Sequence, residues 1–422
     1  MKKYDVTIIG AGASGMLAAI SAAEEGADVL LIEKTGREGR KMLISGKGRC
    51  NITNSAYQSV FYKKIYPKPK FLKYAFSQFF SKDIIDLLEK NGLKTKTERG
   101  GRVFPESDKA KDVTDTLLKI IKSYDNIDIL IKTKLIDIFT EDNIVKSIKI
   151  KTENKEKTVF CNTLILATGG KSYPATGSSG DGFVFAEKLG HKIIKPLPAL
   201  VPLVTEGNIT KKLQGLSLKN INASLFVNGK KTKEEFGEML FAHFGLTGPV
   251  ILTLSGFAVE ALDKNFKTEI NIDLKPALNE TKLDLRLQRE INDNGKKQIR
   301  NVMKSLLPSK LIPVILQIAE IDEFKPCNQI SSKERKRIKF LLKNLRFNIT
   351  GHRGFKEAII TRGGIDTNEI NSRTMMSEII KNLYFAGEII NLDAETGGYN
   401  FQIAFSTGYL AGKSAAETSK NQ

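Results

Sequence analysis

The first 33 residues constrain the fold of this chain more than any other stretch. The apolar run from Tyr4 to Ile9 is typical of a buried parallel strand, and Gly10-Ala11-Gly12-Ala13-Ser14-Gly15 follows it directly. A helical pattern then ends at Gly26, and a second apolar run, from Asp28, ends at Glu33. A glycine turn between strand and helix, with an acid after the next strand, predicts a dinucleotide-binding Rossmann unit.

Each residue of this pattern has a predicted role. Gly10 allows the tight turn, Gly12 lets a pyrophosphate approach the helix N-terminus, and Gly15 lets helix and strand pack closely. Glu33 can accept hydrogen bonds from both ribose hydroxyls, and Lys34 follows it. Ala13 and Ser14 complete the predicted cofactor contacts of this turn.

Two later segments favour FAD over NAD. Thr163–Leu166 is an apolar strand that runs into a glycine turn, and Leu383–Phe385 is another. A helix that begins near Gly398 can direct its N–H groups at the pyrimidine side of a reduced flavin. The predicted cofactor contacts here are Ala167, Thr168, Gly169, Gly170, Gly387, Glu388, Gly398, Tyr399, Asn400 and Gln402.

A loop rich in glycine and cations follows Glu33 and extends to Asn51. Such a loop suits phosphates and the flavin ring, although an ordinary basic surface loop has the same composition. The predicted cofactor contacts in it are Arg40, Lys41, Gly46, Arg49 and Asn51.

The motifs GRCNITN at Gly48–Asn54 and GGYNFQIAF at Gly397–Phe405 resemble those of bacterial three-domain FAD flavoproteins. These aminoacetone-oxidase-type proteins include bile-acid enone reductases and ribosomal RNA dihydrouridine synthases. The resemblance extends over nearly the whole chain and implies FAD as the cofactor. The chain departs from the family pattern at Ala242, at Met376–Glu378 and at Asn391, which bears on the substrate.

The expected fold class is α/β, with a glutathione-reductase-type, Rossmann-like FAD-binding domain of residues 1–195 and 360–422. A small β domain, barrel-like, is expected at 196–276 and 346–359, where short alternating strands follow a proline-rich boundary. Helical periodicity predicts a helical insertion domain at 277–345 within the β domain.

The charge distribution is unusual. The chain has 66 basic and 47 acidic residues, a net charge of +19, and Lys275–Arg346 contributes 17 basic and 8 acidic residues. Phe61–Tyr74 adds five lysines and five aromatics without an acid. Both segments suit the phosphates of a polyanion, and the aromatics of the second also suit base stacking. The family resemblance implies that this polyanion is ribosomal RNA. The alternatives are solvated lysines from a biased genome and aromatics that belong to the core.

The helix expected around Lys333–Leu345 indicates which cations could contact RNA. The apolar residues of this run can face the bundle, which leaves the cations largely on the exposed side. The apolar residues are Ile338, Leu341, Leu342 and Leu345, and the cations are Lys333, Arg335, Lys336 and Arg337.

The sequence favours a cytoplasmic protein without a membrane span or metal site. A strand begins at Tyr4, and the longest apolar run, Pro249–Leu262, is too short to cross a bilayer. Cys50, Cys161 and Cys327 are too scattered for a disulfide framework or a zinc site. No pattern specifies an oligomeric state.

Reduction of an activated C=C bond needs a hydride at one carbon and a proton at its neighbour. The candidate acids are Cys50, His243 and Tyr399. Arg49 beside Cys50 would favour a thiolate, although Cys50 can equally be a small packed residue. His243 would require the inserted domain to fold over the flavin, and it can equally be a turn residue.

Three functions remain open on the sequence. The first is reduction of uridine to dihydrouridine in ribosomal RNA. The second is reduction or oxidation of a small molecule, a steroid enone or an amine. The third is a non-catalytic flavin protein that binds RNA or senses redox state. No second GxGxxG motif is present, so NADH or NADPH is expected only as a transient reductant.

Overall fold

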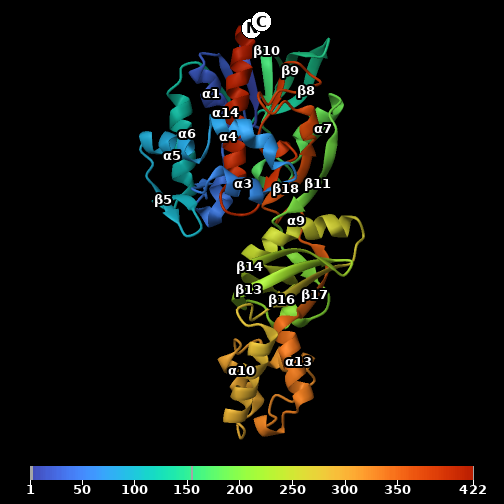
Figure 1. The fold of residues 1–422 in the computed structure, drawn as a ribbon. Coiled ribbons are helices and arrows are strands. Elements are labelled where there is room, and N and C mark those ends of the chain that lie inside the picture. Colours follow the sequence, from blue (N-terminus) through green and yellow to red (C-terminus); the bar gives the residue numbers. More distant parts are fainter. Residues whose placement is uncertain (1–2, 154, 422) are drawn as a thin grey trace. The chain divides into compact units, whose positions relative to one another are not determined.

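The computed structural model describes residues 3–153 and 155–421, which form two compact units (Figure 1). The first unit contains the residues up to Pro198 and those from Ala358 onward, and the second is Ala199–Glu357. Among the described residues, no helix is both long enough and apolar enough to cross a membrane.

The first unit is built on a sheet in which β1, β2, β7, β19 and the end of β10 run parallel. In register, Ile9 at the end of β1 pairs with both Ile32 and Leu166. These strands therefore end at one sheet edge, which brings Gly10, Glu33 and Ala167 together. The strands are β1 (Tyr4–Ile9), β2 (Val29–Ile32), β7 (Ile127–Leu130), β8 (Lys134–Glu141), β9 (Ile144–Thr152), β10 (Lys155–Leu166) and β19 (Leu383–Phe385).

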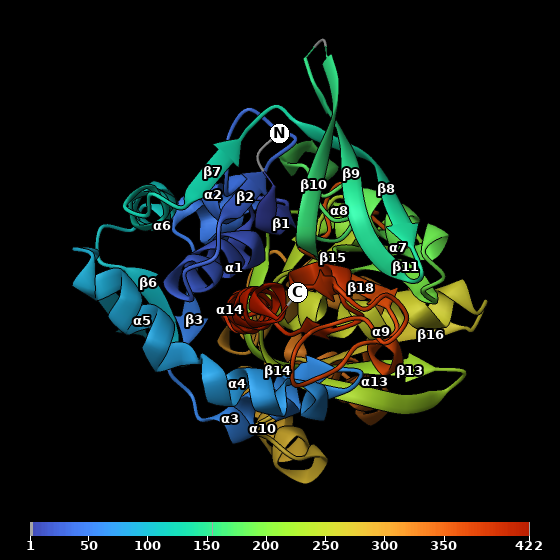
Figure 2. The ribbon, with the colours of Figure 1, turned by 90° about the horizontal axis from the view of Figure 1, so that it is seen from above.

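Helix α1 (Ala13–Glu24) packs along α14 (Tyr399–Lys420), as Figure 2 shows from above. Glycines allow this approach, because a Cβ at Gly408 would lie 2.1 Å from the Ser14 carbonyl oxygen. The other helices of this unit are α2 (Arg40–Ile44), α3 (Gln58–Lys64), α4 (Lys73–Gln78), α5 (Ser81–Lys90), α6 (Ala110–Lys122) and α7 (Asp181–Lys188).

Short sheets flank the main one. They comprise β3 (Thr53–Asn54) with β5 (Thr95–Glu98) and β6 (Arg102–Pro105), β4 (Ile65–Tyr66) with β20 (Asp393–Ala394), and β11 (Ile193–Ala199) with β18 (Ile360–Ile365).

The second unit contains a closed barrel in the order β12-β15-β14-β13-β16-β17. Its strands are β12 (Leu203–Thr205), β13 (Ser217–Val227), β14 (Lys230–Ala242), β15 (Gly245–Thr247), β16 (Thr268–Asp273) and β17 (Leu345–His352), with helices α8 (Ile209–Lys212) and α9 (Pro249–Asp263). Between β16 and β17 the chain forms α10 (Glu280–Asp293), α11 (Ile299–Val302), α12 (Ile312–Ile318) and α13 (Ser332–Lys343). The predicted fold class, a Rossmann-type domain interrupted by a barrel-like domain, is confirmed.

Candidate cofactor site

A cavity of about 460 Å³ lies in the first unit where β1, β2 and β10 end. This volume falls within the usual range for small-molecule and cofactor sites. Many of the residues predicted from the sequence line it: Gly10, Gly12, Ala13, Ser14, Glu33, Lys34, Arg40, Lys41, Gly46, Ala167, Thr168, Gly169, Glu388 and Asn400.

The glycine turn fits a dinucleotide. Gly10 has a φ of 104°, and a Cβ there would lie 2.5 Å from the Ala167 carbonyl oxygen. A Cβ at Gly15 would lie 1.8 Å from the Gly10 oxygen, so helix and strand could not approach this closely. A Cβ at Gly12 would meet no protein atom within 4 Å and would occupy the cavity itself. The space in front of the α1 N-terminus is therefore open to an anion such as a pyrophosphate.

Glu33 is fixed at the cavity wall by backbone amides. Its carboxylate accepts the Ala11 N–H at 3.0 Å and the Thr35 N–H at 2.8 Å. Beside it, the Lys34 ammonium pairs with Asp181 at 2.7 Å. This acidic wall suits the ribose and adenine end of FAD. The start of β8, with Lys134 and Leu135, and Thr133 just before it also contribute here, and the sequence analysis missed all three.

We expect Glu33→Ala to weaken FAD binding by about 1–3 kcal/mol, because a charged hydrogen-bond acceptor is lost. Glu33→Gln, which keeps one of the two accepting oxygens, should lose less. Fluorescence titration of the apoprotein with FAD measures both, with Glu38→Ala as a control in the same loop and outside the cavity lining. Equal affinity of Glu33→Ala and the wild type would contradict this role.

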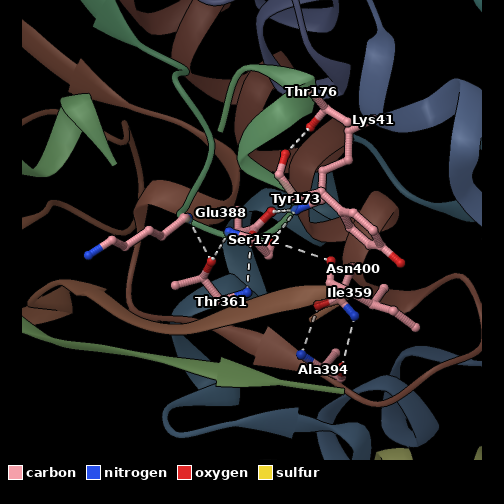
Figure 3. A network of polar contacts seen from close by, with 10 residues as sticks. Lys41, Ser172, Tyr173, Thr176, Ile359, Thr361, Glu388, Ala394 and Asn400 are labelled. Atoms are coloured by element: carbon pink, nitrogen blue, oxygen red, sulfur yellow. Dashed lines mark hydrogen bonds and ion pairs between the residues drawn. The ribbon is translucent and has the colours of Figure 1, made fainter. Parts of the chain in front are cut away.

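A polar network joins four distant segments at the other end of the cavity (Figure 3). The Lys41 ammonium pairs with the Glu388 carboxylate, which also accepts the Ser172 hydroxyl at 2.7 Å and the Thr361 N–H at 2.8 Å. The Thr361 hydroxyl oxygen in turn accepts the Ser172 N–H at 3.0 Å. A Cβ at Gly170 would lie 2.4 Å from that oxygen, so Gly170 shapes the network without lining the cavity.

The N-terminus of α14 is held against β3. A Cβ at Gly398 would lie 2.2 Å from the Thr53 carbonyl oxygen, so only glycine allows this contact. The Thr53 hydroxyl donates to Gln402 at 2.6 Å, and the Asn51 amide, with its oxygen toward Gly398, accepts the Gly398 N–H at 3.0 Å. Asn400 is thereby presented to the cavity. Gly398, Asn51 and Gln402 support the site and do not line it.

The remaining predicted contacts also lie behind the cavity wall. A Cβ at Gly387 would lie 2.5 Å from the Ser14 hydroxyl oxygen, so this glycine keeps its turn close to α1. The Arg49 guanidinium pairs with Glu98 at 2.8 Å and lies over the Phe104 ring at 4.1 Å.

Two of the three candidate acids, Cys50 and Tyr399, lie outside the cavity lining, and the third, His243, belongs to the second unit. Cys50 is fully buried, and burial raises the pKa of its thiol to about 12, so the predicted thiolate is wrong. Tyr399 is 7% exposed, its ring packs on Phe61 at 4.7 Å, and burial raises the pKa of its hydroxyl. His243 is exposed in the second unit, in the turn between β14 and β15.

We expect the native protein to resist alkylation of its cysteines at pH 8. All three are buried, and with a thiol pKa of about 12 only about 10⁻⁴ of Cys50 is ionised at that pH. Iodoacetamide followed by peptide mass spectrometry should label none of them before denaturation and all three afterwards. Rapid native labelling of Cys50 would restore it as a candidate acid.

Tyr173 is a cavity-lining residue that the sequence analysis did not select. It is half-buried and has a φ of 49°, a left-handed conformation that is uncommon for a bulky residue. Within the part of the chain that the structure describes, its hydroxyl forms no hydrogen bond. Ile359 and Asn400 also line the cavity, and Figure 3 shows them with Tyr173. A phenol is thus available to a bound molecule.

The basic segment Phe61–Tyr74 does not offer the predicted row of stacking rings. Phe61 and Phe71 are buried, and the Tyr66 ring lies under the Arg362 guanidinium at 4.2 Å. Tyr74 is 39% exposed. Most of these aromatics therefore belong to the core, which was the alternative interpretation.

Comparisons with known proteins agree with this geometry. The family described as HI0933-like protein Rossmann domain matches residues 4–414. The ribosomal RNA dihydrouridine synthase of Escherichia coli (strain K12) is 30% identical over 410 residues, which cover 97% of each chain. The 3-dehydro-bile acid delta(4,6)-reductase of Clostridium scindens is 28% identical over 420 residues, covering 98% of this chain and 99% of the relative.

The fold is also found among solved structures. A 3-ketosteroid-delta4-(5alpha)-dehydrogenase from Rhodococcus jostii RHA1 has a TM-score of 0.50 at 15% identity, covering 98% of this chain and 97% of that one. The glycine turn, the position of Glu33 after β2 and the family match over residues 4–414 lead to one assignment. This chain belongs to the HI0933-like Rossmann family of FAD-dependent oxidoreductases.

Proposed function

We propose that this protein reduces uridine to dihydrouridine in ribosomal RNA, in the cytoplasm, with NADH or NADPH as a transient reductant. The observation that carries the proposal is the 30% identity to a ribosomal RNA dihydrouridine synthase over 97% of both chains. The concentration of positive charge in Lys275–Arg346, a net +9, supports a polyanionic substrate.

The reaction adds a hydride to one carbon of a C=C bond conjugated to a carbonyl group and a proton to its neighbour. FAD, when bound and reduced by a nicotinamide, would supply the hydride. The chain holds the cofactor at Gly12, Glu33 and Asn400. Tyr173 donates the proton, since its hydroxyl is the phenol that lines the cavity and is free to reach a bound substrate.

Reduction of a steroid enone is the second candidate function. The relative from Clostridium scindens, named as a bile acid delta(4,6)-reductase, spans the chain equally well at 28% identity. Both candidate reactions saturate a C=C bond activated by a carbonyl group, so the same cavity and proton donor can serve either substrate.

Mass spectrometry of ribosomal RNA tests the proposal. We expect ribosomal RNA from a deletion strain to lack a dihydrouridine that is present in the parent and restored by the wild-type gene. Incubating the purified protein with that RNA and NADH or NADPH should restore it in vitro. An unchanged dihydrouridine content, together with oxidation of the reduced flavin by a 3-keto-4-ene steroid, would favour the second candidate.

A further inference from the structure

Helices α10 and α13 form one layer of the helical insertion (Figure 1). They run antiparallel, because Glu280 pairs with Lys339 at 3.8 Å while Asp284, one turn on, pairs with Arg335 at 3.2 Å. Helix α10 also packs on α11, α13 packs on α12, and α11 packs on α12. The outward faces of α10 and α13 therefore lie on the same side, opposite the α11–α12 layer.

Helical periodicity defines the composition of those outward faces. On α10 the core positions Leu283 and Leu287 leave Lys282, Leu285 and Arg289 outside. On α13 the core positions are Ile338 and Leu342, and the outside positions are Lys333, Lys336 and Phe340. We call these six exposed residues the two-helix face: Lys282, Leu285, Arg289, Lys333, Lys336 and Phe340.

The two-helix face combines free cations with exposed apolar groups. Leu285 is 60% exposed and Phe340 is 59% exposed. In the described structure, Lys282, Arg289, Lys333 and Lys336 form no ion pair or side-chain hydrogen bond. Cations without internal partners, on the same two helices as an exposed aromatic ring, are the complement of phosphates and an unstacked base.

The neighbouring cations are engaged within the fold. Arg335 is bound through its guanidinium to Asp284, and Arg337 pairs with Glu320 at 2.6 Å. These two arginines, expected with the other cations largely on the exposed side, are instead half-buried and paired. Two nearby acids are engaged as well, because Glu280 pairs with Lys339, and Glu334 pairs with Lys325, which lowers the pKa of its carboxyl to about 2. Asp293 at the end of α10 is exposed.

We propose that the two-helix face docks ribosomal RNA, with the four cations on phosphates and Phe340 against an unpaired base. The proposal rests on the proposed function, because it takes ribosomal RNA as the substrate whose backbone the face binds. On α13 the phosphates are bound by Lys333 and Lys336, and on α10 by the cations of the two-helix face. Arg335 and Arg337, which are paired within the fold, take no part in docking.

The test uses the FAD-loaded full-length protein and ribosomal RNA from a deletion strain. The variant Arg289→Glu/Lys333→Glu/Lys336→Glu should bind this RNA about 10- to 100-fold more weakly. Its slope of log affinity against log salt should fall by about 2 to 3, since each lost phosphate contact removes about 0.7 to 0.9. Phe340→Ala, which changes no charge, should weaken binding about tenfold with an unchanged slope.

The matched control reverses three exposed lysines on helices of the first unit, Lys82, Lys119 and Lys122, and changes the net charge equally. It should keep more of the affinity than the face variant, and all variants should keep the FAD spectrum. Dihydrouridine formation is measured on the same samples.

The outcomes separate the two proposals. Equal RNA affinity of the face variant and the control overturns the docking surface, even when the wild type forms dihydrouridine. Selective loss of binding in the face variant supports the docking surface, even when no dihydrouridine is formed, and the absence of product then overturns the proposed function. If the wild type binds no RNA, both proposals fail.

Discussion

Tyr173→Phe is expected to retain FAD and to slow reduction of the C=C substrate by about 10²- to 10⁴-fold, the usual contribution of one positioned general acid. The substitution removes only the hydroxyl and keeps the ring that lines the cavity. The backbone of Tyr173 has a φ of 49°, a left-handed conformation that costs about 1–3 kcal/mol in a non-glycine residue. Backbone strain of this kind is concentrated at functional sites.

Rapid-mixing spectroscopy separates the two halves of the reaction. Flavin reduction by the nicotinamide should proceed at the wild-type rate in Tyr173→Phe, while flavin reoxidation by the substrate should be slow. Tyr57→Phe is the matched control, because Tyr57 is 85% exposed and lies outside the cavity lining. Reoxidation of Tyr173→Phe within twofold of the wild type would remove Tyr173 as the proton donor.

The cofactor turn could be predicted because its requirements are local in sequence. Gly10 must adopt a positive φ, and Gly15 must leave room for the Gly10 carbonyl group five residues earlier. Glu33 follows the next strand, and parallel pairing of β1 with β2 brings it to the same edge. The strand β1, the glycine turn and Glu33 are therefore enough to predict this part of the cofactor site from the sequence.

Positions that depend on long-range packing could not be predicted in the same way. Cys50 lies next to Arg49 in sequence, but its pKa is set by burial, while Arg49 turns to Glu98. Tyr173 has no motif signal, since its place on the cavity wall follows from the left-handed turn after β10. Likewise, Arg335 is an exposed cation by periodicity alone, and only the neighbouring helix supplies Asp284.

Arg362→Met is expected to destabilise the first unit by about 3–5 kcal/mol, because it removes the guanidinium that pairs with the buried Asp393 carboxylate. Arg362 on β18 and Asp393 on β20 are 5% and 3% exposed. Two parallel hydrogen bonds of 3.0 Å join the guanidinium to the carboxylate. The same guanidinium lies over Tyr66, whose strand β4 pairs with β20, so one arginine ties three short strands together.

The double variant Arg362→Met/Asp393→Leu distinguishes the cost of an unpaired charge from the loss of packing. Replacing both partners by apolar groups removes the buried charge, so this variant should recover most of the lost stability. Urea unfolding followed by flavin fluorescence measures both variants. FAD affinity should fall together with the free energy of unfolding. Asn400 lines the cavity, and its side-chain amide is hydrogen-bonded to the backbone of Ala394 in β20. If the double variant is as unstable as the single one, the lost stability comes from the packing of the two side chains and not from an unpaired buried charge.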